Sequence, residues 1–522
     1  MTSSDTDDAQ IQERVFAFLT DPKQHPSVRR IDTHAASVFL EGARALKIKR
    51  AVRFPFLDYS SLAKRKAACE EEIRINRPFA PTIYHRVVPI TRDENGSLSL
   101  DGDGTPVEYA VEMTRFDERQ TIDHLAGAGP LDGGLVDAIG EAVAASHAVA
   151  PRADGRSWTA SIPHLIQGNS AALHALGSYL GNSAPAKIDD LDSASQAAFA
   201  RVQGLLDARG RNGFVRRCHG DLHLANIVLI DAKPVLFDAI EFDETIATVD
   251  VLYDLAFPLM DFLRYDQPEA ANRLLNRYLA ITPPDNSQAL AALPLLMSLR
   301  AAIRAHVMLA RLKRAGSDTD TAAMTATSHR YFDLACTLIH PPAPVLIAVG
   351  GLSGTGKSVL ARGMAPLIPP PPGAVVLRSD ALRKQLFGVG ETDALPPAAY
   401  EPEINTRIYA ALVDRAAEIL TQGHSVVVDA VYAKEEERHA IREVAGKAGV
   451  RFAGFFLVAD LATRQARITG RRADASDATA EVAAIQESYR IGTVDWTMVD
   501  ARGTPQSLVQ RCQAEIAGTA AQ

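Results

Sequence analysis

The last third of the chain opens with the stretch that decides its fold, Val345-Leu346-Ile347-Ala348-Val349-Gly350-Gly351-Leu352-Ser353-Gly354-Thr355-Gly356-Lys357-Ser358. Its first half is a short apolar run typical of a buried strand, and its second half has the spacing G-x-x-x-x-G-K-[S/T]. Backbone N–H groups of such glycines wrap phosphates, the lysine neutralises their charge, and the hydroxyl binds Mg²⁺ at the start of a helix. We therefore expect a nucleotide at Gly351, Ser353, Gly354, Thr355, Gly356, Lys357 and Ser358, with Ser358 also a metal ligand.

A proline-rich linker, Pro341-Pro342-Ala343-Pro344, precedes this stretch and predicts a domain boundary. We expect one domain over residues 1–340 and a second over residues 341–522. In the second, apolar runs at 375–377, 424–429 and 451–458 alternate with helical patterns. This alternation predicts an α/β domain with a parallel sheet and crossover helices.

The first domain divides again by pattern. Up to about residue 116, short apolar strands at 36–40, 45–49 and 107–113 are mixed with a charged helix over about 60–76. This predicts a small α+β lobe. From about 117 to 340 the pattern is mainly helical and is interrupted by a polar insert, so a helical lobe should follow.

Composition restricts the class of protein and its partners. A net charge of -8 on 522 residues gives no broad basic surface, so nucleic acid is a less favoured partner. The four cysteines are far apart without a C-x-x-C pair, which argues against a disulfide framework or a zinc site. The N-terminus is polar and acidic, and no apolar run approaches the roughly 20 residues that a bilayer requires. We expect a cytoplasmic protein without a membrane span, and the oligomeric state stays open.

A second informative stretch is Cys218-His219-Gly220-Asp221-Leu222-His223-Leu224-Ala225-Asn226-Ile227-Val228-Leu229. It is polar where a surface loop is expected and then becomes a strand. Asp221 and Asn226 are five residues apart, the spacing of a catalytic loop in which Asp accepts a hydroxyl proton and Asn holds Mg²⁺. Asp238, at the end of the next predicted strand, is a candidate second metal ligand. The alternative is that these residues only form turns.

This stretch resembles the H-G-D-x-x-x-x-N loop of the aminoglycoside phosphotransferase family, and Asp254-Leu255-Ala256 resembles the later D-L-A of that family. The resemblance implies a bilobal, protein-kinase-like fold with Asp221 as the base and with Asn226 and Asp238 as metal ligands. The segment from Asp238 to Asp254 is longer than usual for the family. Glu241 therefore remains an alternative metal ligand.

A small lobe of this kind holds ATP through a lysine paired with a helix carboxylate. Lys47 and Lys49 alternate onto one face of a predicted strand, and we select Lys47. Glu72, near the inward face of the charged helix, is the selected partner. The alternative for Lys47 is a solvated strand lysine.

After the second predicted strand of the C-terminal domain comes Arg378-Ser379-Asp380-Ala381-Leu382-Arg383. It resembles the group of P-loop kinases that includes polynucleotide kinases, zeta-type toxins and gluconate kinases. The resemblance implies that Asp380 activates the acceptor hydroxyl and that Arg383 contacts the substrate. It also implies a lid whose arginines close over the phosphate, and among them we select Arg467 and Arg471. The alternatives are a helix cap at Ser379 and Asp380, and a solvated arginine face.

Together the two halves resemble a bacterial fusion of an aminoglycoside phosphotransferase-like domain with a C-terminal P-loop kinase or AAA-type ATP-binding domain. We expect an enzyme with two nucleotide sites that uses ATP and Mg²⁺ to phosphorylate hydroxyl groups of small molecules. Two alternatives remain. One domain is a nucleotide-sensing regulatory module, or the P-loop domain is a polynucleotide- or toxin-type kinase.

Overall fold

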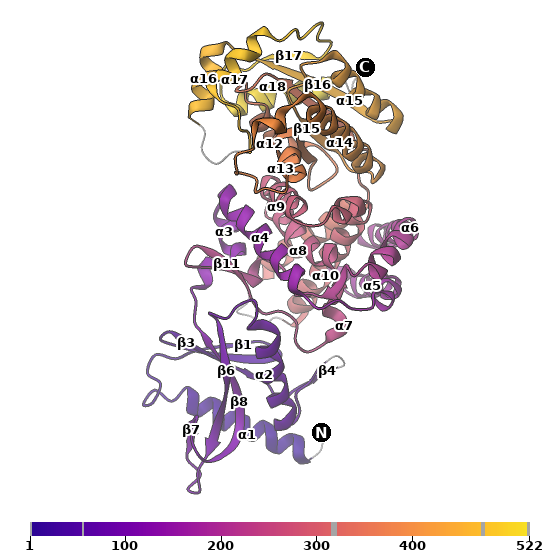
Figure 1. Cartoon of the computed structure of the whole chain (residues 1–522). Helices are drawn as coiled ribbons and strands as arrows, with labels where there is room; N and C mark the ends of the chain where they lie inside the picture. The colour runs from indigo at the N-terminus through magenta and orange to yellow at the C-terminus, as the bar shows by residue number, and fades with distance from the viewer. Residues whose placement is uncertain (1–2, 55–56, 315–320, 471–474, 519–522) are drawn as a thin grey trace. The chain divides into compact units, whose positions relative to one another are not determined.

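The computed structural model describes residues 3–54, 57–314, 321–470 and 475–518. The chain forms two compact units, residues 1–163 with 203–261 and residues 164–202 with 262–522 (Figure 1). Three helices contribute residues to both units: α5 (Gly155–Ala175), α6 (Ala184–Arg211) and α8 (Val251–Arg264). The domain division at residue 340 stays a prediction.

The first unit contains an antiparallel sheet in the order β1-β2-β3-β8-β6-β7. Its strands are β1 (Arg29–Asp32), β2 (Ala36–Glu41), β3 (Arg44–Lys49), β6 (Tyr84–Arg92), β7 (Leu98–Leu100) and β8 (Thr105–Thr114). Side chains alternate between the two faces of the sheet. Leu46 and Ile48 pack with α1 (Ser3–Leu19), whereas Val111 packs with Cys69 of α2 (Leu62–Asn76). The predicted α+β lobe is confirmed.

The remainder of the first unit is built from short paired strands and helices. Strand β9 (Val215–Arg217) pairs with β12 (Thr248–Asp250), and β10 (Ile227–Ile230) pairs with β11 (Lys233–Leu236). The small hairpin strands are β4 (Arg53–Phe54) and β5 (Leu57–Asp58), and the helices are α3 (Ile122–Ala128), α4 (Gly133–Val149) and α7 (Glu244–Ala247). The polar insert predicted from the sequence occupies the connections between these strands.

The second unit includes the helices α9 (Pro268–Ile281), α10 (Leu293–Arg314) and α11 (Thr321–Leu338). Within the described part of the chain, the stretch Pro284–Lys313 is the one long and apolar enough to cross a membrane by length and composition. Of its most apolar window, 67% is buried inside the fold, which is the pattern of a core helix.

The second unit also contains a parallel sheet in the order β14-β15-β13-β16-β17, which confirms the predicted α/β class. The strands are β13 (Val345–Gly351), β14 (Val375–Arg378), β15 (Val426–Asp429), β16 (Arg451–Val458) and β17 (Thr497–Asp500). The helices are α12 (Lys357–Met364), α13 (Ser379–Leu386), α14 (Pro402–Thr421), α15 (Glu435–Ala448), α16 (Leu461–Thr469), α17 (Ala480–Ile485) and α18 (Pro505–Gly518). Strand β13 lies in the centre and is buried along its whole length, so its carboxyl end is a rigid base for a ligand site.

Helix α9 joins this sheet to the helices of the same unit. Asn272 donates a hydrogen bond to the Ala374 carbonyl at 2.9 Å, and Asn276 accepts one from the Val376 N–H at 2.7 Å. Both contacts use backbone groups at the start of β14.

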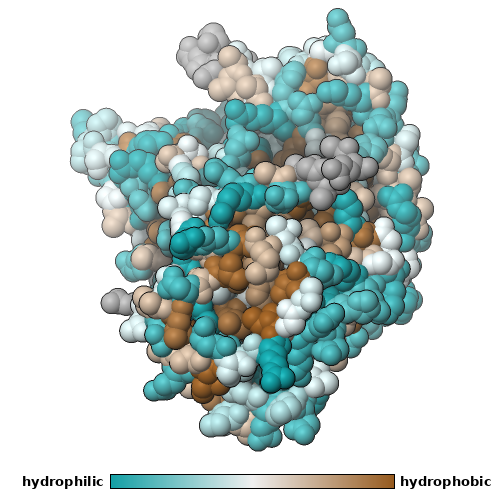
Figure 2. Space-filling model, turned by 90° about the horizontal axis from the view of Figure 1, so that it is seen from above, coloured by the Kyte–Doolittle hydropathy of each residue, from teal (hydrophilic) through white to brown (hydrophobic). Residues whose placement is uncertain are grey.

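The surface seen from above carries a patch of apolar side chains surrounded by hydrophilic ones (Figure 2).

Candidate active sites

The connection between β9 and β10 places Asp221 beside Asn226. The Asn226 amide donates to the Asp221 carbonyl at 2.8 Å and to its Oδ2 at 3.4 Å. The chain turns at Gly220, where φ is +83° and a Cβ would lie 3.0 Å from the Ala247 side chain, so glycine is required. The Asp221 side chain is 39% exposed, which leaves a candidate base accessible to an acceptor.

A buried network supports this loop from α8. Asp254 accepts hydrogen bonds from the Gly220 N–H at 2.8 Å and from His147 Nε2 at 3.1 Å. The Cys218 thiol lies in the same cluster and donates to the Val249 carbonyl at 3.6 Å. His, Cys and Asp are also metal-ligand types, but these hydrogen bonds already engage Asp254 and Cys218. We interpret the cluster as the support of the loop, which gives Asp254-Leu255-Ala256 a physical reason.

Asp238 lies in a strained loop just after β11. Its φ is +61°, a left-handed conformation that is costly for a residue with a Cβ and is often found at functional sites. Its N–H donates to the Tyr84 hydroxyl at 3.0 Å. Asn76 at the end of α2 donates to the Ala239 carbonyl at 3.3 Å and accepts from the Ala239 N–H at 2.7 Å. These contacts fix the backbone on both sides of the Asp238 side chain.

The structure brings together Lys47, Glu72 and Asp238, which the sequence selected separately. Lys47 Nζ donates to Glu72 Oε1 at 2.8 Å and to Asp238 Oδ1 at 2.6 Å. Burial disfavours the charged form of each group. The neighbouring opposite charges outweigh it: Asp238 and Glu72 raise the pKa of Lys47 well above its usual value, and Lys47 lowers the pKa of both carboxyl groups. All three groups are therefore held in their charged forms.

Lys49, the other lysine of β3, is buried more deeply, with 3% of its side chain exposed. It forms ion pairs with Glu72 Oε2 at 2.6 Å and with Glu241 Oε1. Glu241, the alternative metal ligand, is therefore engaged by Lys49. Asp238 and Asn226 offer the oxygen donors that Mg²⁺ prefers, and the Asp238 side chain is 44% exposed. We call Asp221, Asn226, Asp238, Lys47 and Glu72 the first site.

Two further acidic side chains, Asp261 and Asp243, have local hydrogen-bond partners. Asp261 accepts the Leu224 N–H at 3.0 Å, and Asp243 caps α7 by accepting the Thr245 N–H at 2.8 Å. Both contacts stabilise the backbone around the first site. His223 Nε2 lies 3.4 Å from Asp221 Oδ2.

The loop after β13 has the conformation that its sequence requires. At Gly354 φ is +86°, and a Cβ there would lie 2.5 Å from the Arg464 carbonyl, so the loop tolerates only glycine. Helix α12 begins at Lys357, whose Nζ donates to the Leu352 carbonyl at 3.3 Å. The Ser358 hydroxyl donates to Asp429, which ends the adjacent parallel strand β15. A hydroxyl and a carboxylate in contact at a strand end form an oxygen donor pair that suits Mg²⁺.

Three side chains that were not selected from the sequence contact this loop and the pair of Ser358 and Asp429. Gln486 Oε1 accepts from the Ser353 N–H at 2.7 Å, and its Nε2 donates to Ser353 Oγ at 3.0 Å. Arg464 Nε donates to the Ser353 carbonyl at 2.8 Å. Arg378 donates to Ser358 Oγ at 3.2 Å and to Asp429 at 3.4 Å. No motif signals a glutamine, whereas Arg464 and Arg378 lie inside segments that the sequence had marked.

Of the two arginines selected for the expected lid, the structure describes one. Arg467 donates to the Thr355 carbonyl at 3.0 Å and to the Ala501 carbonyl at 2.8 Å, so it joins the loop to the segment after β17. Arg471 lies outside the described residues.

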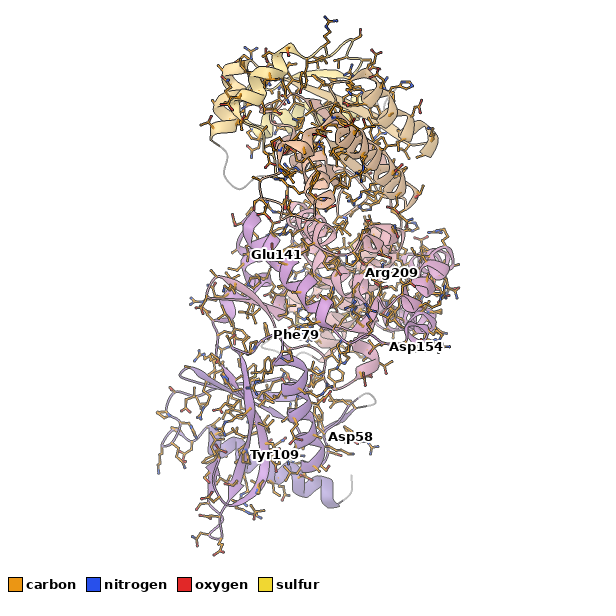
Figure 3. All side chains as sticks on the ribbon, viewed as in Figure 1. Asp58, Phe79, Tyr109, Glu141, Asp154 and Arg209 are labelled. Carbon is orange, nitrogen blue, oxygen red and sulfur yellow. The ribbon has the colours of Figure 1, made fainter. Side chains whose placement is uncertain are left out.

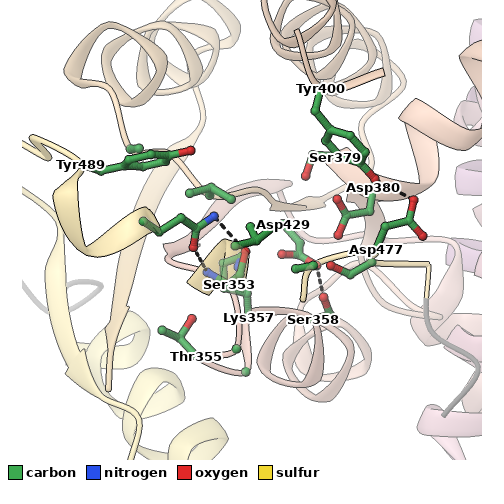
Figure 4. A pocket seen from close by; sticks show the side chains of 18 of the residues that line it. Ser353, Thr355, Lys357, Ser358, Ser379, Asp380, Tyr400, Asp429, Asp477 and Tyr489 are labelled. Carbon is green, nitrogen blue, oxygen red and sulfur yellow. Dashed lines mark hydrogen bonds between the residues drawn. The ribbon is translucent and has the colours of Figure 1, made fainter. Parts of the chain in front are cut away.

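A cavity of about 1410 Å³ opens over the loop, with Asp380, Asp429 and Lys357 among its lining residues (Figure 4). Ligand pockets usually measure about 300–1,000 Å³, so this one has room for a nucleotide and an acceptor together. Asp380 lies in the first turn of α13, where burial and the nearby Asp429 raise its pKa. It does not cap the helix, because the capping position is Arg378. We call residues 351–358, Asp380 and Asp429 the second site.

Arg383 lines the same cavity but already has partners. It donates to the Ala399 carbonyl and to Asn405 Oδ1 at 2.7 Å, and its guanidinium lies 4.8 Å from the centre of the Tyr400 ring. Asp477 accepts from Lys384 Nζ at 2.6 Å and from the Tyr400 hydroxyl at 2.7 Å. These contacts fasten one wall of the cavity, and a substrate contact by Arg383 stays a prediction. Figure 3 shows the side chains of both units as sticks on the ribbon.

Two family profiles match parts of this chain. The profile described as the phosphotransferase enzyme family matches residues 32–293, half of the chain. The chain belongs to that family. In this phosphotransferase, residues 346–490 match a second profile, described as an AAA domain. The predicted fusion is therefore confirmed, and so is the predicted enzyme class of kinase or phosphotransferase.

The phosphotransferase is similar along most of its length to uncharacterized proteins of Mycobacterium tuberculosis and Mycobacterium bovis. Each is 29% identical over 466 residues, which cover 87% of this chain and 88% of the relative. Among solved structures, a choline/ethanolamine kinase family protein from Mesorhizobium loti is 14% identical, with a TM-score of 0.36 and coverage of 63% of this chain and 99% of that one. A gluconokinase from Sinorhizobium meliloti is 24% identical, with a TM-score of 0.25 and coverage of 34% and 93%.

Proposed function

We propose that the protein has two ATP- and Mg²⁺-dependent phosphotransferase sites, each of which phosphorylates a hydroxyl group of a small molecule. The observation that carries the proposal is the contact of Lys47 with both Glu72 and Asp238, which lie 25 and 191 residues away. Phosphoryl transfer needs a lysine paired with a helix carboxylate, and a second carboxylate that can hold a metal ion. Here these groups meet beside the loop that carries Asp221 and Asn226.

At the first site, Asp221 accepts the proton of the acceptor hydroxyl while the hydroxyl oxygen attacks the γ-phosphorus of ATP. The new P–O bond forms while the bond to the β-phosphate oxygen breaks, and ADP leaves. Lys47 neutralises charge on the phosphates, and Glu72 holds the lysine in place. Bound Mg²⁺ would be held by Asn226 and Asp238 and would stabilise charge on the transferring group.

At the second site, Asp380 has the corresponding role of base, and backbone N–H groups of residues 351–358 with Lys357 bind the phosphates. Ser358 and Asp429 would hold the metal ion there. The raised pKa of Asp380 suits a base, since a carboxylate with a higher pKa takes up a proton more readily.

The acceptor at the second site is proposed to be a small molecule. The contacts of Asp477 with Lys384 and Tyr400 fasten one wall of the cavity, whose volume of about 1410 Å³ suits a nucleotide together with a small acceptor. The mild negative charge of the chain also gives no support to a broad nucleic-acid groove.

The test is label transfer from γ-labelled ATP to a pooled library of metabolites and oligonucleotides, followed by mass spectrometry. Wild-type protein is compared with Asp221→Asn and Lys357→Ala. Asp231→Asn, at an exposed turn, and Lys447→Ala, 78% exposed, are the matched controls. We expect one set of products to disappear in Asp221→Asn and another set in Lys357→Ala, with both controls unchanged.

Other outcomes would contradict parts of the proposal. Labelled oligonucleotides that disappear in Lys357→Ala would make the second site a polynucleotide kinase. If one of the two variants formed every product that the wild type forms, the domain that carries that substitution would be a nucleotide-sensing module.

A further inference from the structure

The second lysine of β3 has a buried position of its own in the first site. Lys49 shares Glu72 with Lys47, and each lysine contacts a different carboxylate oxygen of that residue. On its other side Lys49 contacts Glu241 Oε1, and the Tyr59 hydroxyl donates to the same oxygen at 3.3 Å. Burial opposes the charge of Lys49, but Glu72 and Glu241 raise its pKa, so the ammonium stays charged. A buried charge with two carboxylate partners is costly to disturb.

Glu241 ends the short loop that carries Asp238. The backbone of this loop is attached at three successive residues: Asp238 to Tyr84, Ala239 to Asn76, and Ile240 through its N–H to the His219 carbonyl at 3.0 Å. After Ile240, the side chain of Glu241 provides the next attachment, and it reaches β3. Both ends of the loop therefore connect to the same strand, one through Lys47 and the other through Lys49.

The two lysines have different surroundings. Asp238, the partner of Lys47, is 44% exposed, whereas Glu241, the partner of Lys49, is 8% exposed. If Lys47 turned to the phosphates of a bound nucleotide, Asp238 would lose this partner and would be available to hold a metal ion. Glu241 has no such freedom, because turning away would leave Lys49 buried without its partner. Lys49 also keeps its hold on Glu72 during this exchange, since it uses the other carboxylate oxygen.

We propose that Lys49 is a positioning residue of the first site: through Glu241 it fixes the loop of Asp238, so that Asp238, and not Glu241, is the residue presented to the metal ion. The metal role in this inference rests on the proposed function, whereas the fixing of the loop does not.

The direct test is hydrogen exchange of the full-length protein without nucleotide. Lys49→Met is the obvious variant, but it strands two buried carboxylates and is at risk of not folding. Glu241→Gln is nearly isosteric and removes only the charge that faces Lys49. Lys49→Arg keeps the charge, and Glu244→Gln, exposed three residues further on, is the matched control.

In Glu241→Gln we expect the amides of residues 238–240 to exchange about tenfold faster, while peptides from β6 and β8 are unchanged. Lys49→Arg and Glu244→Gln should exchange like the wild type. Unchanged exchange at 238–240 would overturn the inference, because Tyr84 and Asn76 would then hold the loop alone. Equal acceleration throughout the small lobe would also overturn it, because the ion pair would then only stabilise the lobe.

A second readout concerns the metal ion. ADP affinity is measured with Mg²⁺ and with chelator in a Lys357→Ala background, which is expected to abolish ADP binding at the second site. Glu241→Gln should lower the gain in affinity due to Mg²⁺ about fivefold and leave the affinity in chelator unchanged. An unchanged Mg²⁺ gain would overturn the role of Lys49 in presenting Asp238. If the enzyme transferred no phosphate at all but the loop still loosened, the proposed function would fail while the positioning by Lys49 stood.

Discussion

The two proposed sites differ in how far apart along the chain their residues lie. At the second site, the phosphate loop, the lysine and the serine are contiguous, and the parallel pairing of β13 with β15 brings Asp429 to Ser358. At the first site, Lys47 and Asp238 are 191 residues apart and meet only because the loop after β11 reaches back to β3. The first site is therefore held by buried ion pairs, whereas the second is a contiguous loop held by side-chain hydrogen bonds from Gln486, Arg464 and Arg378. We therefore expect side-chain charges to govern the stability of the first site and the geometry of the loop to govern nucleotide binding at the second.

We expect the largest effect from removing the candidate base of the second site. Asp380→Asn removes the proton acceptor and should lower transfer by the second site about 100- to 10,000-fold, without changing products of the first. The measurement is the rate of product formation at saturating ATP. Asp414→Asn, exposed on α14, is the control. Loss of both product sets in Asp380→Asn would show that the sites do not work separately.

Glu72→Gln should destabilise the first unit by about 3–5 kcal/mol, because it leaves Lys47 and Lys49 buried with one partner fewer. Hydrogen exchange in α2 and β3 measures this free energy locally. The exposed Glu70→Gln on the same helix is the matched control. A loss no larger than that of Glu70→Gln would contradict the ion-pair account.

This effect should also depend on pH. The lysines lower the pKa of Glu72 below its ordinary 4.5, so its contribution to stability is present above that pH. As the pH falls through the lowered pKa the carboxylate takes up a proton, and the difference between wild type and Glu72→Gln should shrink. A difference that persisted unchanged in acid would mean that charge is not what holds the site.

At the second site, the acid limb of the pH–rate profile should lie above the ordinary aspartate pKa of 3.8. Burial and Asp429 raise the pKa of Asp380, so the base is protonated, and the rate falls, at a higher pH than for an exposed carboxylate. The profile is measured on kcat for products lost in Asp380→Asn. A rate that stayed level down to pH 3.8 would exclude Asp380 as the base.

The smallest expected effect concerns the phosphate loop. Gln486→Ala removes two hydrogen bonds to Ser353 and should weaken ADP binding at the second site about tenfold, with the first site unaffected. Calorimetry measures the affinity, and Gln513→Ala, exposed on α18, is the control. Equal affinities for the two variants would mean that the loop keeps its shape without Gln486.

The sequence predicted most where local pattern and chemistry coincide. The phosphate loop and the catalytic loop are contiguous, so glycine spacing and the five-residue step from Asp221 to Asn226 were visible without a structure. The choice between Lys47 and Lys49 could not be made from the sequence, because alternation places both lysines on one face of β3. Only the fold shows which carboxylates each lysine contacts. Gln486 was missed because it lies 133 residues from Ser353 and carries no charge or motif.

The central claim, two separate nucleotide sites, is tested most directly by the stoichiometry of ADP binding in the presence of Mg²⁺. Calorimetric titration of the wild type should give two ADP molecules per chain. Lys357→Ala and Asp238→Asn should each remove one of the two, and the double variant should bind none. A wild-type stoichiometry of one, unaffected by one of the two substitutions, would contradict the account.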